Sequence, residues 1–348
     1  MGASNGGSGT RLLSQSEIGS ALDCQARWDF GYGGRLAGSA LKAKRVAPIL
    51  SEGRAWGAAA ARWHTNGFGL YDACDALADS LSRDAERQRE FRVYDPAGHE
   101  ALRKRLTQML THYHSIAEQI PMDPVTEREL NVPIPSRTGH RVSSRYRLLG
   151  YIDATREVDG RTWLVEFKLR GRLSTVQQIS LSRQIRWYAW AYERETGIPI
   201  AGVETVERWN EVPKLPRLVK TGRKDGALRP SHATDQLCTA DDYLASCAKY
   251  DEEPHDDVLA ALRERRWQQR VPIVLRRGEM DEVGRELVSA GRLIAQLDSG
   301  LLYPMRNAKP QNCNGCSFRD ICAAPDPELV DALYERIPAK RDREETPA

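Results

Sequence analysis

Four cysteines at the two ends of this chain of 348 residues constrain its fold more than any other feature. Cys24 lies near the start, and Cys313, Cys316 and Cys322 lie together in NCNGCSFRDIC near the end. Thiolates at C-x2-C-x5-C spacing with one distant partner are typical of a single metal or iron–sulphur site, and structural zinc suits the same ligands. We therefore expect a fold that brings the N-terminal segment back to the C-terminal one.

The overall composition is nearly balanced in charge. Lysine and arginine number 51 and aspartate and glutamate 48, so the net charge of +3 does not by itself indicate a nucleic-acid partner. No apolar run is long enough to span a bilayer, and no signal peptide is evident. The cysteine usage fits a reducing cytoplasm, where clustered cysteines bind metal more often than they form disulfides. We expect a cytoplasmic protein without membrane contact.

The periodicity of apolar residues changes along the chain. It predicts helices in the first third, over residues 52–65, 70–88 and 98–119, and places Cys24 on an earlier helix. Strand-like segments follow Pro124, with a hairpin turn at residues 159–160, and then come a helix over residues 176–195 and another strand. This order predicts an α/β fold with a mixed central sheet flanked by helices and an N-terminal helical arm.

We expect one folded domain over residues 13–335. A Gly/Ser-rich disordered tail at 1–12 precedes it, and a flexible charged tail at 336–348 follows it. The domain divides into a helical arm, a catalytic core, a basic loop or insertion and a closing cysteine segment, at residues 13–120, 121–209, 210–280 and 281–335. In the insertion we expect Lys220, Arg223 and Lys224 to contact phosphates, with a merely solvated loop as the alternative.

Three polar residues in the predicted strand hairpin carry the candidate chemistry. Asp153 ends one strand, and Glu166 and Lys168 lie two positions apart in its partner LVEFKL, hence on one face. Charges on such an apolar strand are costly to bury without a metal or a counter-charge. Two carboxylates can hold Mg2+ or Mn2+, which polarises a phosphoryl group, and lysine can stabilise the developing negative charge. An ordinary surface ion pair is the alternative.

The segments GYID and LVEFK resemble the signature of the PD-(D/E)XK nuclease superfamily. The helix segment QIRWY is similar to the Q-x-x-x-Y helix of the RecB and AddB branch, and places Gln184 and Tyr188 on one helix face. The four cysteines match the arrangement in the iron–sulphur members of that branch, which include RecB-like exonucleases of CRISPR adaptation. The resemblance covers residues 13–324 and implies a restriction-endonuclease-like core.

The resemblance implies a metal site for this chain. Asp153, Glu166 and the backbone carbonyl of Phe167 would be ligands of Mg2+ or Mn2+, and Lys168 would be the catalytic lysine. The family often adds a histidine ligand from an N-terminal helix. Its position is held by glycine here, so either His64, two helical turns later, substitutes for it, or the histidine ligand is absent and water fills the site.

The resemblance also implies contacts with DNA and a cluster. Gln184 and Tyr188 would contact or position DNA beside the metal, and we expect the neighbouring Arg183 and Arg186 to bind it. The four cysteines, Cys24, Cys313, Cys316 and Cys322, would hold a [4Fe–4S] cluster with a structural role.

The function implied is metal-dependent hydrolysis of DNA, by an exonuclease on single strands or ends in bacterial or phage recombination, repair or DNA metabolism. A non-catalytic DNA-binding scaffold of the same fold is one alternative, and a structure-specific or RNA-directed endonuclease is another. The intact set of Asp153, Glu166 and Lys168 argues against the scaffold. No helicase or nucleotide-binding motif appears, so a helicase or recombination partner would have to supply any unwinding.

Overall fold

A four-stranded mixed sheet forms the centre of the computed structural model, which describes residues 10–45, 47–123, 128–136, 142–220, 227–323 and 325–342. The strand order is β10-β7-β6-β5, with β6 and β7 parallel and both outer pairs antiparallel. These strands are β5 (Ala154–Val158), β6 (Arg161–Arg170), β7 (Ile200–Trp209) and β10 (Gln268–Val274). The prediction of a mixed α/β sheet is confirmed.

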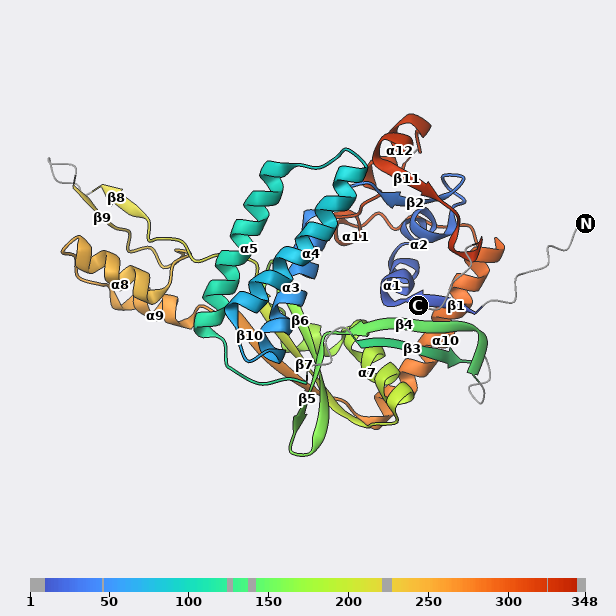
Figure 1. Cartoon of the computed structure of the whole chain (residues 1–348), viewed down its shortest axis with the longest axis horizontal. Helices are drawn as coiled ribbons and strands as arrows, with labels where there is room; N and C mark the ends of the chain where they lie inside the picture. The colour runs from blue at the N-terminus through green and yellow to red at the C-terminus, as the bar shows by residue number, and fades with distance from the viewer. Residues whose placement is uncertain are drawn as a thin grey trace, which may run out of the picture.

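Three long helices cover one face of this sheet (Figure 1): α3 (Pro48–Thr65), α4 (Leu70–Glu90) and α5 (Pro96–Ile116). Val165, Phe167 and Val206 project from β6 and β7 into the apolar cluster that these helices form. The start of α5 follows from its sequence, because the Asp95 side chain accepts a hydrogen bond from the Gly98 backbone N–H. The helices predicted for the first third of the chain therefore form a layer on one face of the sheet.

The other face of the sheet packs on a second apolar cluster. Leu164 and Val203 enter it from the central strands, opposite in direction to Val165 and Phe167. The cluster includes residues of α1 (Gln15–Asp23), α7 (Arg183–Thr196), α10 (Arg277–Ser299) and the small sheet β1-β4-β3, whose strands are Arg11–Ser14, Val142–Ile152 and Arg128–Pro135. The short α6 (Val176–Ser180) precedes α7.

Segments near the two ends of the described chain meet, as the cysteine spacing predicts. A buried ion network joins Arg11 to Glu17 and Asp298, and Lys340 reaches the second oxygen of Glu17 at 2.7 Å. Two short strands, β2 (Ala40–Ala43) and β11 (Tyr334–Ile337), also pair across the ends. Both predicted tails were too long: β1 begins at Arg11, and β11 and the short helix Lys340–Asp342 extend into the predicted C-terminal tail, because the buried charges hold both segments.

The predicted insertion contains regular structure. It forms the hairpin β8 (Leu218–Lys220) and β9 (Leu228–Pro230) and the helices α8 (Ala240–Lys249) and α9 (Asp256–Glu264), which project from one end of the molecule (Figure 1). The strand β10 was missed, because its polar start and Pro272 hide the alternation; an edge strand tolerates proline. Among the described helices, none has the length and apolar character needed to cross a bilayer.

Candidate active site

The three candidate residues meet where β5 begins beside β6. Asp153 lies between β4 and β5, and pairing of β5 with β6 begins at Ala154 opposite Val165. Asp153 Oδ2 accepts a hydrogen bond of 2.7 Å from the Phe167 backbone N–H. This bond fixes the aspartate against the part of β6 that β5 no longer covers.

Glu166 is held from two sides. Its side chain is buried and shares a face with Lys168, as predicted, while Phe167 points into the opposite core. Glu166 Oε1 pairs with Lys168 Nζ and accepts a hydrogen bond of 2.9 Å from Gln184 Nε2, which comes from the start of α7. A buried carboxylate needs such partners, and here they also fix its orientation.

Tyr188 lies near the carboxylates of Glu166 and Asp153. Its ring lies so close to Gly150 that a Cβ atom there would come within 2.6 Å of Tyr188 Cε1. Burial, and then the charges of Glu166 and Asp153, raise the pKa of the Tyr188 hydroxyl well above its ordinary value, so it stays protonated at neutral pH. Sequence reasoning missed Gly150; the signal was a glycine inside the strand segment GYI, which favours close approach of a neighbour.

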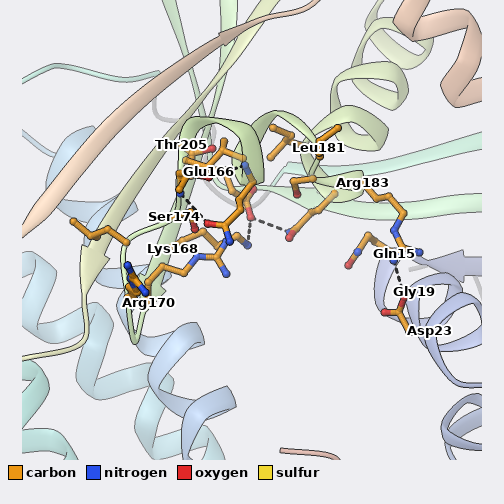
Figure 2. Close-up of a pocket in the computed structure, with 18 residues that line it drawn as sticks. Gln15, Gly19, Asp23, Glu166, Lys168, Arg170, Ser174, Leu181, Arg183 and Thr205 are labelled. Carbon is orange, nitrogen blue, oxygen red and sulfur yellow. Dashed lines mark hydrogen bonds and ion pairs between the residues drawn. The ribbon is translucent and has the colours of Figure 1, made fainter. Parts of the chain in front are cut away.

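Two surface clefts meet at these residues. One, of about 780 Å3, lies between the end of β6, α6 and the N-terminal helix α1, and Figure 2 shows Glu166 and Lys168 in it with Arg183 extending toward Asp23. The other, of about 590 Å3, lies beneath α3 and α4 and includes Asp153. Glu166, Lys168 and Gln184 line both clefts. The candidate site therefore occupies the middle of one continuous groove.

The loop after β6 forms one wall of this groove. The carboxylate of Glu207 holds this loop in place through four hydrogen bonds. Glu207 on β7 accepts hydrogen bonds from the Ser174 N–H (2.7 Å), Ser174 Oγ (2.8 Å), Arg170 Nε (2.9 Å) and Gln269 Nε2 (2.8 Å). Burial acts to raise the pKa of Glu207, but these bonds lower it overall, so the carboxylate is ionised at neutral pH. Sequence reasoning missed this residue too, because its role depends on three distant segments.

The structure places His64 in the protein core, away from Asp153 and Glu166. It is 2% exposed, Nδ1 lies 2.9 Å from the Ile120 carbonyl and Nε2 lies 2.8 Å from the Tyr113 hydroxyl. Its ring stacks on Phe167, on the face of β6 opposite Glu166, because α3 passes there over the apolar side of the strand. Burial lowers the pKa of His64 to about 4. The histidine is a neutral core residue with both nitrogens engaged.

The cysteine segment returns to the part of the chain that contains Cys24. Cys24 lies in extended backbone between α1 and α2 (Gln25–Trp28), not on a helix as predicted, because the helix ends at Asp23. The Asp23 carbonyl accepts hydrogen bonds from Asn307 Nδ2 (2.7 Å) and Asn312 Nδ2 (3.1 Å). Throughout the described ranges, no group of three or more His, Cys, Asp or Glu side chains is arranged to hold a metal ion.

Two observations place the thiols of Cys24, Cys316 and Cys322 near one another. Cys24 and Cys322 contact the same small apolar cluster, to which Phe318 also contributes. Burial raises the pKa of the Cys316 thiol, and the nearby Cys24 and Cys322 thiols raise it further. Cys313 begins the same short segment, at the end of α11 (Pro310–Cys313).

The predicted DNA-binding residues lie in different places. Arg183 lines the groove and pairs with Asp23 at 2.6 Å, whereas Arg186 pairs with Glu286 at 3.0 Å and does not line either cleft. Lys220 is exposed on the distant hairpin strand β8. Arg223 and Lys224 lie outside the described residues.

Comparison with known proteins identifies the family. The model of the PD-(D/E)XK nuclease superfamily matches residues 12–323, a span that contains the candidate active site and all four cysteines of the end segments. No curated protein matches the sequence. Ten chains of solved structures match, among them the crystal structure of SSO0001, with 15% identity, 71% of this chain and 81% of that chain covered, and a TM-score of 0.28. The chain therefore belongs to the PD-(D/E)XK nuclease superfamily.

Proposed function

We propose that this protein is a Mg2+- or Mn2+-dependent deoxyribonuclease with its active site at Asp153, Glu166 and Lys168. The observation that carries the proposal is the placement of these residues at the middle of a groove, with each carboxylate held by a hydrogen bond. Membership of a nuclease superfamily supplies the reaction class.

The donor atoms fit a hard divalent cation. Asp153 and Glu166 would hold it, together with the backbone carbonyl of Phe167. The N–H and C=O of a strand residue point to the same side, and the N–H of Phe167 faces Asp153, so its carbonyl is directed to that side as well. Such a cation polarises the phosphoryl group and lowers the pKa of bound water. Water would fill the coordination positions that these ligands leave open.

Each remaining residue has a separate task. Lys168 lies against Glu166, within reach of a phosphate at the carboxylates, and would stabilise the negative charge that develops there. Gln184 orients Glu166, and Tyr188 keeps a protonated hydroxyl beside both carboxylates. Gln184 also lines both clefts, which supports a role for it next to the DNA.

We further propose an exonuclease that acts on single-stranded DNA or DNA ends, and a [4Fe–4S] cluster at Cys24, Cys313, Cys316 and Cys322. The exonuclease preference rests on resemblance to the RecB and AddB branch. The cluster rests on the cysteine spacing and on the hydrogen bonds that bring Asp23 to the cysteine segment. Its role would be structural, because it would close a loop of nearly the whole chain.

The test compares the wild-type protein with Lys168→Ala on end-labelled single-stranded and duplex DNA, anaerobically, with Mn2+ or Mg2+. We expect the variant to bind DNA and to cut it at least a hundredfold more slowly, a loss typical of one electrostatic donor in a hydrolytic site. Arg161→Ala, at the far end of the same strand, is the control and should cut normally. Binding by the wild type without cleavage under either metal would leave a DNA-binding scaffold as the function.

A further inference from the structure

The groove continues on both sides of the candidate active site. The cleft beneath α3 and α4 approaches Glu166 and Lys168 from one side, and the cleft along α6 and α1 leaves from the other. A pocket for a terminal nucleotide would end at the carboxylates. Here they lie where the two arms join, so a strand placed with one phosphate at Glu166 has room for nucleotides on either side.

Each arm presents arginines that no protein carboxylate neutralises. Arg62 on α3 and Arg83 on α4 line one arm, and Arg172, after β6, lines the other; all three are exposed. In the part of the chain that the structure describes, their side chains form no ion pair or hydrogen bond. Guanidinium groups along a groove are the usual ligands of a nucleic-acid backbone.

Other arginines of the groove are already held by acidic partners. Arg54 pairs with Asp84 at 2.6 Å, and Arg170 pairs with Glu207 at 2.9 Å. These pairs are part of the groove walls. Arg62, Arg83 and Arg172 are the arginines of this groove that remain available to bind phosphate. Each arm thus contains at least one paired and at least one unpaired arginine.

The arm that carries Arg172 is fixed in place. Ser174, two residues later, bonds to Glu207 through both its N–H and its hydroxyl, and Thr175 caps α6 in a reciprocal pair with Gln178. A loop anchored in this way holds the Arg172 backbone in place, so binding has to order only the arginine side chain. The arm that carries Arg172 is thus preformed. The arm that carries Arg62 and Arg83 is preformed too, because it lies on the two long helices α3 and α4.

We infer that the substrate strand lies across the whole groove, with Arg62 and Arg83 binding phosphates on one side of the scissile phosphate and Arg172 binding on the other. Cleavage then takes place within the bound segment, and the first products are oligonucleotides, not mononucleotides. This inference rests on the proposed nuclease function, which it deepens by assigning the substrate a length and two binding arms.

The test is a single-turnover digestion of single-stranded DNA labelled at the 5′ or the 3′ end, with Mn2+ and excess enzyme. We expect the shortest product released first from either labelled end to be an oligonucleotide. A labelled mononucleotide as the first product would overturn the inference while leaving the nuclease function intact. Absence of any cleavage would remove both.

Variants of the two arms provide a second test. Arg172→Ala and the double variant Arg62→Ala/Arg83→Ala should each raise KM, roughly tenfold per arginine, with kcat nearly retained. Each arginine removed should also lower the slope of log affinity against log salt by about 0.7 to 1. Arg103→Ala, on α5 and outside the groove, is the matched control. If either arm's variant behaves as this control does, that arm does not bind the strand and the inference fails.

Discussion

Gln184 donates a hydrogen bond of 2.9 Å to the Glu166 oxygen that also pairs with Lys168. Gln184→Ala should therefore free the carboxylate to rotate, without removing any group that would bind the metal. We expect kcat to fall about tenfold to a hundredfold, the cost of about 1–3 kcal/mol for one bond to a charged group. Steady-state kinetics with a labelled strand would measure it. Gln177→Ala, on the exposed side of α6, should be neutral, and equal kinetics for both variants would contradict the role of Gln184.

Gly150 leaves the space that Tyr188 fills. Gly150→Ala would place a Cβ atom 2.6 Å from the ring, so the tyrosine or the strand must shift. We expect a loss of about 1–3 kcal/mol in the free energy of unfolding, typical of overpacking. Gly278→Ala, where nothing lies within 4 Å of the added atom, is the matched control for denaturant unfolding and should show no loss. Equal stability of the two variants would show that Tyr188 moves without cost.

Stability should depend on pH through His64. Burial lowers the pKa of His64 from 6.5 to about 4, so between these values the unfolded chain binds more protons than the folded chain. The free energy of unfolding therefore rises with pH from about 4 to 6.5, and up to about 3 kcal/mol is lost as the pH falls through that window. Denaturant titrations at several pH values would measure this slope. His64→Gln should reduce it, although His112, whose pKa burial also lowers to about 4, keeps part of it. An unchanged slope would contradict the assignment.

The cysteine segment should matter for stability more than for hydrolysis. Cys316→Ser should abolish bound iron and visible absorbance, and lower the melting temperature, while the folded variant retains Mn2+-dependent cleavage. Anaerobic purification followed by iron analysis, calorimetry and a cleavage assay would measure all three. Cys74→Ser, on α4 and outside the segment, is the control and should keep the absorbance. A wild-type protein loaded with zinc and lacking iron would contradict the cluster.

The sequence predicted those parts of the site that depend on local periodicity. Glu166 and Lys168 had to share a face because they lie two apart in a strand, and the structure places them there, with Phe167 in the opposite core. Gln184 and Tyr188 had to share a helix face for the same kind of reason. The mixed α/β fold followed from the change between helical and strand periods along the chain.

The features that sequence reasoning missed depend on distant parts of the chain. His64 has the right residue type and helix spacing for a ligand, but only the packing of α3 against β6 shows that its ring stacks on Phe167. Glu207 is bonded by Ser174 from the loop after β6 and by Gln269 from β10, and β10 itself forms by pairing with β7. Such contacts form between residues far apart in sequence, so no local pattern encodes them.

The pairing of Lys340 with Glu17 has a consequence for synthesis on the ribosome. The helix α1 supplies Gln15, Gly19 and Asp23 to the groove, and its buried Glu17 lacks one of its two cationic partners until Lys340 has left the exit tunnel. Nascent chains that end before this lysine therefore carry a complete carboxylate pair but a loosely held groove wall. The groove wall that α1 supplies is thus completed only by a contact between residues 323 positions apart in the chain.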